Sequence, residues 1–102
     1  MIGKPNEPSS IAVKEREASY IRLRWTAPST DRGSPIIDYT IRIQDNVNTS
    51  DTKELKNVIG TETLVVRLTP GATYSVWVYA RNIVGYGDAR FTSFTTKIRG
   101  TL

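Results

Sequence analysis

The sequence predicts an all-β fold, an antiparallel two-sheet β-sandwich of about seven short strands. Two observations predict it. Apolar residues alternate with polar ones, as on strands that have one buried face, and turn-forming residues interrupt the chain at short intervals. No segment has the apolar spacing of an amphipathic helix of ordinary length. The 102 residues correspond to a single domain.

The segments with strand character follow one another along the chain, separated by polar turns. Strands are expected at residues 9–15, 19–26, 37–44, 53–59, 61–68 and 73–82, and a last strand is expected through residues 91–96. The segments at 27–35, 45–53 and 82–90 contain the Gly, Pro, Asn, Asp and Ser residues that are typical of loops. Lysines in the fourth segment suit an edge strand, because they discourage pairing with another chain.

The segment from Thr73 to Arg81 alternates most regularly, and it has aromatic residues on both faces. The side chains of one face are Tyr74, Val76, Val78 and Ala80, and those of the other are Ser75, Trp77, Tyr79 and Arg81. Burial of an unpaired Arg would cost several kcal/mol, so the face with Tyr74 is expected to be the core. Trp77 is therefore expected to be exposed.

The segment at residues 61–68 is compatible with two registers. Strict alternation back from Leu68 would bury Leu64 and Val66. A bulge before Leu68 would bury Val65 instead. The pattern leaves both registers open.

Several motifs narrow the choice among sandwiches. They are "LRW" followed by "TAP", "DRGSPI" leading into "DYTI", and "LTPGATYSVWVYARNIVGYG". With these motifs the chain closely resembles a fibronectin type III domain over nearly its whole length. The resemblance implies an immunoglobulin-like sandwich at residues 9–97. Residues 1–8 are then expected to be a linker or an added N-terminal segment, and residues 98–102 a C-terminal linker.

The resemblance also assigns structural roles to particular residues. It implies a tyrosine corner, in which the hydroxyl of Tyr74 bonds a backbone group between Leu68 and Pro70. Trp25, Tyr39, Leu68 and Tyr74 are expected to belong to the core.

Two outward-facing groups of residues are candidate binding surfaces. Trp77 and Tyr79 would neighbour Arg42 and Thr40 on the adjacent strand, with Phe91 nearby, and these residues form a candidate protein-binding face. The alternative is structural, because Arg42 stacked on Trp77 would be a cation–π pair.

The second group is basic. Arg22, Arg24 and Arg67 are expected to face outward on neighbouring strands, and similar faces bind heparin-like polyanions in some relatives of the family. The alternative is a solvated charged face that serves solubility.

The composition excludes several classes of function. The chain has no Cys and no His, which removes disulfides, thiolate metal sites and the usual general base. We therefore expect no enzymatic activity, no cofactor and no metal site. The net charge of +4 is spread along the chain without a nucleic-acid-binding motif, so nucleic acid is not an expected partner. No apolar run is long enough for membrane insertion.

These observations predict a non-enzymatic module of a multidomain cell-adhesion, receptor or matrix protein. It would act as a spacer between neighbouring domains and as a scaffold that binds a protein partner. One alternative is a module that binds glycosaminoglycan through the arginines, and another is an intracellular spacer of a giant muscle protein. An extracellular setting is favoured, slightly supported by the N-glycosylation sequon at Asn48.

Overall fold

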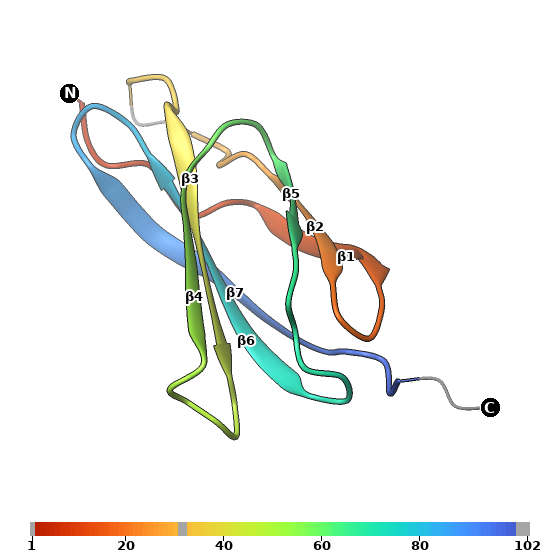
Figure 1. Ribbon diagram of the computed structural model, residues 1–102. Helices are drawn as coiled ribbons and strands as arrows, with labels where there is room; N and C mark the ends of the chain where they lie inside the picture. The colour runs from red at the N-terminus through yellow and green to blue at the C-terminus, as the bar shows by residue number, and fades with distance from the viewer. Residues whose placement is uncertain (1, 31–32, 100–102) are drawn as a thin grey trace.

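The computed structural model describes residues 2–30 and 33–99 (Figure 1). Within these ranges the chain forms seven strands and no helix. The strands are β1 (Ser10–Arg16), β2 (Ile21–Thr26), β3 (Asp38–Asp45), β4 (Thr52–Val58), β5 (Glu62–Val65), β6 (Thr73–Arg81) and β7 (Tyr86–Thr95). This part of the chain has no helix long and apolar enough to cross a membrane.

The strands form two sheets that pack against each other. One sheet has the order β1-β2-β5, the other has the order β4-β3-β6-β7, and all the paired neighbours are antiparallel. The predicted fold class, a two-sheet antiparallel sandwich, is confirmed. In the larger sheet β4 is an edge strand, in keeping with its lysines.

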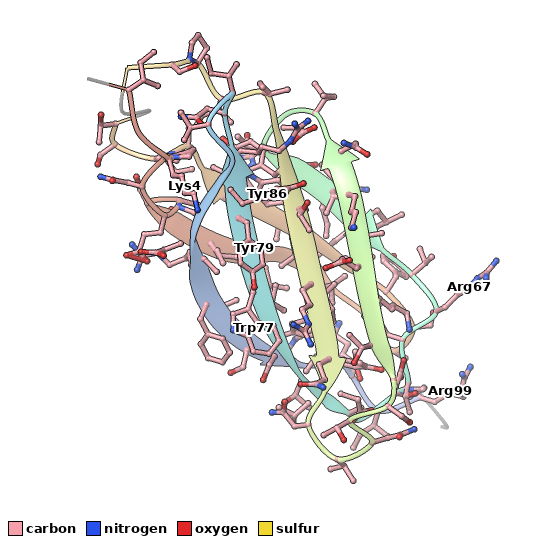
Figure 2. The ribbon with its side chains drawn as sticks, turned by 90° about the vertical axis from the view of Figure 1, so that its left-hand side faces the viewer. Lys4, Arg67, Trp77, Tyr79, Tyr86 and Arg99 are labelled. Atoms are coloured by element: carbon pink, nitrogen blue, oxygen red, sulfur yellow. The ribbon has the colours of Figure 1, made fainter. Side chains whose placement is uncertain are left out.

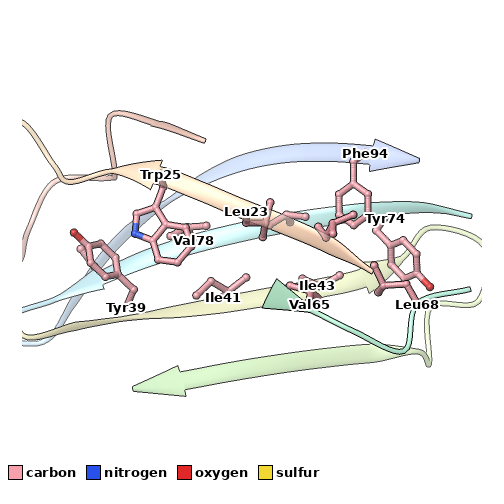
Figure 3. Close-up of a cluster of buried hydrophobic side chains, with 13 residues drawn as sticks. Leu23, Trp25, Tyr39, Ile41, Ile43, Val65, Leu68, Tyr74, Val78 and Phe94 are labelled. Carbon is pink, nitrogen blue, oxygen red and sulfur yellow. The ribbon is translucent and has the colours of Figure 1, made fainter. Parts of the chain in front are cut away.

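The core lies between the two sheets (Figure 3). Its buried hydrophobic residues are Ile21, Leu23, Trp25, Tyr39, Ile41, Ile43, Val65, Leu68, Tyr74, Val76, Val78, Ala80 and Phe94. All of them except Leu68 come from alternate positions of the strands, because successive side chains of a strand point to opposite faces. The four residues assigned to the core from the sequence are all buried.

Aromatic pairs pack at two places in this core. Trp25 meets Tyr39 edge-on, with ring centroids 5.3 Å apart. Tyr74 stacks on Phe94 at 5.4 Å, and the backbone amide of Thr69 donates a hydrogen bond of 2.8 Å to the Tyr74 hydroxyl. That hydrogen bond is the contact expected of a tyrosine corner, because it satisfies the polar end of a buried ring.

The register of β5 is the bulged one. Val65 is buried, whereas Leu64 and Val66 are 43% and 47% exposed, so strict alternation back from Leu68 is wrong for this segment. Arg67 has a φ of 62°, in the left-handed region, and this residue changes the direction of the chain. Because of it, Leu68 returns to the core although it lies three positions after Val65.

The last strand begins earlier than the sequence suggests. Residues 82–90 were expected to be a loop, but β7 starts at Tyr86, which pairs with Arg81. The connection is short because the Asn82 side-chain oxygen accepts hydrogen bonds from the amides of Val84 and Gly85. This compact turn returns the chain directly into the sheet.

Residues 2–8, the described part of the segment expected to be a linker, pack against the β6–β7 hairpin. Pro5 and Pro8 are buried, and the Arg90 side chain donates a 2.9 Å hydrogen bond to the Pro8 carbonyl. The Asn82 amide nitrogen donates to the Gly3 carbonyl at 2.7 Å. These contacts attach the segment to the sandwich. Residues 1 and 100–102 of the two expected linkers lie outside the described residues.

Candidate functional site

A row of outward-facing side chains crosses the larger sheet. Glu54, Arg42, Trp77 and Phe91 are successive partners across β4, β3, β6 and β7. The Arg42 guanidinium lies 5.7 Å from the Trp77 ring centroid, and the Phe91 ring lies 5.5 Å from it on the adjacent strand. Trp77 was expected to be exposed, but it is half-buried because its neighbours cover part of the ring.

A second pair of rings lies further along the same face. Tyr79 and Tyr86 meet edge-on with centroids 6.4 Å apart, and the Arg81 guanidinium lies 5.9 Å from the Tyr86 centroid. The Thr40 hydroxyl donates a 2.8 Å hydrogen bond to the Tyr86 hydroxyl. Thr40 was expected to contribute to an accessible face, but it is only 5% exposed. It supports Tyr86 and has little surface of its own for a partner.

We call the group of Trp77, Tyr79, Tyr86 and Phe91 the aromatic face (Figure 2 labels its first three members). A shallow hollow of about 200 Å³ adjoins it, lined by Tyr79, Tyr86, Thr40, Glu54 and Lys56. Sequence reasoning missed Tyr86 because "GYG" reads as a turn. The sequence held no clear signal for it, because a register shift between Tyr79 and Arg81 gives Tyr86 and Phe91 opposite parity along the same strand although both face outward.

An ion pair supports the Tyr86 end of this face. Arg81 binds the Asp38 carboxylate through both oxygens, at 2.8 and 2.6 Å, and the Asn57 amide donates to Asp38 at 3.1 Å. Asp38 is 3% exposed. Arg81 holds the pKa of Asp38 below its usual value, since both hydrogen bonds and charge favour the ionised form. The pair also fixes Arg81 against Tyr86.

The arginines of the other sheet are arranged differently from the expectation. Arg22 donates to Glu15 at 3.0 Å and to Glu62 at 3.2 Å, and Arg24 also binds Glu62, at 3.2 Å. Arg67 lies beyond the end of β5, in the left-handed turn, and is not on a strand beside them (Figure 2). Two arginines are thus brought together with two glutamates. This arrangement does not support the polyanion-binding hypothesis.

The described residues hold no cluster of three or more His, Cys, Asp or Glu side chains that could bind a metal ion. A second hollow, of about 720 Å³, lies between the N-terminal segment and β7, and its lining includes Lys4, Glu7, Asp88 and Arg90. Arg90 in this hollow is engaged by Glu7 at 3.7 Å and by the Pro8 carbonyl. The hollow is therefore the seam along which the N-terminal segment packs.

Comparison with known proteins agrees with this architecture. Residues 6–96 match the profile of the fibronectin type III domain. The chain belongs to the fibronectin type III family. Among solved structures it resembles domains A168–A170 of titin, with a TM-score of 0.81 and 23% identity over 92% of this chain and 32% of that one. It also resembles the chicken CNTN1 FN1–FN3 domains, with a TM-score of 0.77 and 25% identity over 93% and 34% of the two chains.

Curated relatives of this fibronectin type III domain are much longer proteins. Human cell adhesion molecule DSCAM is 32% identical over 85% of this chain and 4% of that protein. The mouse neural cell adhesion molecule L1-like protein is 33% identical over 91% of this chain and 8% of that protein. The titin homolog of Caenorhabditis elegans is 33% identical over 83% of this chain. The domain thus corresponds to a small part of each adhesion relative.

The Arg42–Trp77 contact should be measurable as a coupling energy. Trp77→Ser is expected to lower the free energy of unfolding, and about 0.5–1 kcal/mol of that loss should disappear when Arg42 is already Ala. Urea unfolding of the wild type, both single variants and the double variant gives the coupling. Additive losses would mean that the guanidinium and the ring do not interact in solution.

The Asp38–Arg81 pair should make the stability depend on pH in the acid range. The pKa of Asp38 in the folded protein lies below the ordinary value of 3.8. The contribution of the pair to the free energy of unfolding is therefore complete above that value and is lost as the pH falls through the folded pKa. In Asp38→Asn, the free energy of unfolding should be lower at neutral pH and should fall less steeply on acidification. Asp88→Asn, at an exposed position of β7, is the matched control and should keep the wild-type slope. Equal acid slopes in wild type and Asp38→Asn would contradict this assignment.

Proposed function

We propose that this domain is a non-catalytic module of a multidomain cell-adhesion, receptor or matrix protein, acting as a spacer and as a protein-binding scaffold in an extracellular setting. The similarity to DSCAM and to the L1-like protein, 32% and 33% identical over most of this chain, carries the proposal. Both relatives are cell adhesion molecules by name. The sequence has no His, which removes the usual general base and is consistent with a non-catalytic role.

The shape of the domain suits a spacer. It measures 57 × 25 × 18 Å. The residues near the N-terminus and those near the C-terminus of the chain lie at opposite poles of the sandwich (Figure 1). Neighbouring domains of the parent chain would then be held apart by the long axis of the sandwich. The buried core and the packed N-terminal segment make this spacer rigid.

The aromatic face is the proposed contact surface for a protein partner. Phe91 is 54% and Tyr86 39% exposed, and Arg42, which lies against Trp77, is exposed as well. Aromatic residues and Arg are the types enriched where proteins bind one another. Because the rings are already ordered by neighbouring side chains, little side-chain entropy would be lost on binding.

Cell attachment to surfaces coated with the domain tests this proposal. The double variant Trp77→Ser/Phe91→Ser should reduce attachment strongly, because loss of an interface hot spot costs about 2 kcal/mol or more. Arg22→Ser/Arg24→Ser, on the opposite sheet, is the matched control and should attach cells like the wild type. Circular dichroism and thermal unfolding establish beforehand that each variant is folded. Equal attachment by the wild type and the aromatic variant would refute a contact through this face.

An intracellular spacer is the second candidate, favoured by the similarity to the titin homolog. Antibodies against the domain distinguish the two settings. Staining of intact cells that express the parent protein is expected for the extracellular module. Staining only after permeabilisation would favour the intracellular array.

A further inference from the structure

We propose that Asn48 is an N-glycan acceptor of this domain, an inference that rests on the extracellular setting of the proposed function. Asn48-Thr49-Ser50 is the single Asn-x-Ser/Thr sequence in the chain. A sequon alone occurs often by chance. The conformation of the β3–β4 connection supplies the further support.

The sequon lies at the tip of an ordered, protruding turn. The Asp45 carboxylate accepts hydrogen bonds from the backbone amides of Val47 and Asn48, at 2.8 and 3.0 Å. The Asp51 amide donates to the Asn48 carbonyl at 2.9 Å and closes the turn. Val47 is 92% exposed, and Asn48 is exposed as well. A glycan attached here would extend into solvent without displacing any packed side chain.

The Asn48 side chain has its reactive atom free. The Ser50 hydroxyl donates a 2.7 Å hydrogen bond to Oδ1 of Asn48. Its Nδ2 atom makes no hydrogen bond with any described residue. The hydroxyl that the sequon requires thus engages the amide oxygen, and the residue that would carry the sugar is exposed.

The covalent step joins Nδ2 of Asn48 to the anomeric carbon of an oligosaccharide. The donor is a lipid-diphosphate-linked oligosaccharide, whose bond between the anomeric carbon and the phosphate oxygen breaks. The lipid diphosphate leaves with the electron pair, and the amide gives up one proton to a base. No oxidant or reductant takes part.

The position of the turn is compatible with the aromatic face. The turn lies at the end of the larger sheet opposite to Tyr86 (Figure 2), and Ser75 of β6 donates to Asn46 at 2.7 Å at that end. A glycan on Asn48 would therefore begin at the pole of the sandwich. The Tyr79–Tyr86 part of the aromatic face would stay open to a partner.

Secretion of the domain from cultured mammalian cells, behind a signal peptide, tests the acceptor. The wild type should migrate as a larger species that peptide N-glycosidase reduces to the size of the unmodified chain, with conversion of Asn48 to Asp detected by mass spectrometry. Asn48→Gln and Ser50→Ala should lose this shift, and Ser50→Thr should keep it. Asn46→Gln, in the same turn but outside a sequon, is the matched control and should also keep it.

Secreted, folded wild-type protein that carries no glycan on Asn48 would overturn the proposal. This outcome is distinct from a failure of the proposed function. If the wild type carries no glycan but the Trp77→Ser/Phe91→Ser variant still reduces cell attachment, only the glycan acceptor is rejected. If the domain is glycosylated but the double variant attaches cells as well as the wild type does, only the contact through the aromatic face is rejected.

Discussion

Trp25→Ala should lower the free energy of unfolding by about 3–5 kcal/mol, the range for removal of a large buried aromatic side chain. Trp25 is 2% exposed and packs edge-on against Tyr39 with ring centroids 5.3 Å apart. It extends from β2 into the core between the two sheets, so its removal leaves a cavity that neither sheet can close without shifting (Figure 3). Urea or guanidinium denaturation measures the loss as a lower midpoint.

Two control variants make the result specific. Trp25→Phe keeps a ring in the core and removes a buried indole nitrogen that has no hydrogen-bond partner among the described residues, so its cost should be smaller. Phe91→Ala removes a ring of the outer face that is 54% exposed, and its cost should also be smaller. A denaturation midpoint of Trp25→Ala equal to that of the wild type would show that this ring is not part of the core.

Tyr74→Phe should cost about 1–3 kcal/mol, because it retains the ring and removes only a hydroxyl that has a backbone partner. The Thr69 amide donates to that hydroxyl at 2.8 Å, and Tyr74 itself is 1% exposed. The stacking of the ring on Phe94 is unaffected by the change. The loss therefore reports the hydrogen bond that connects β6 to the chain after β5.

The same substitution at Tyr79 gives a matched control on the same strand. Tyr79 lies on the outer face and its hydroxyl has no hydrogen bond to any described residue, so Tyr79→Phe should change the free energy of unfolding little. Parallel denaturation of the two variants isolates the effect of position. Equal losses at Tyr74 and Tyr79 would remove the energetic basis of the tyrosine corner.

The faces of the main strands could be predicted from the sequence. In β2 the apolar residues alternate with Arg, and β6 has Arg81 on the face opposite to Tyr74; a strand cannot turn one residue inward without turning its neighbour outward. Burial of Arg81 without a partner would be too costly, so the face with Tyr74 was assigned to the core, and the resemblance to the family placed Trp25 there as well. The motif around Tyr74 was specific enough to indicate the family and the corner contact.

The partners of the outward side chains depended on which strands became neighbours. Trp77 is half-buried because Arg42 and Phe91, from the neighbouring strands β3 and β7, cover its ring. Arg22 lies between Glu15 and Glu62, which come from different strands on either side of β2. A local pattern specifies the face of a residue but carries no information about these cross-strand contacts.

Local backbone conformation accounts for the remaining differences. The left-handed conformation of Arg67 changes the parity between Val65 and Leu68, and residue type gives no sign of it, since Arg rarely adopts that region. The early start of β7 depends on the turn closed by Asn82. The conformation of Arg67 forms only when the sheets pack, because the gain from burying Val65 and Leu68 offsets a backbone conformation that the isolated segment would not prefer.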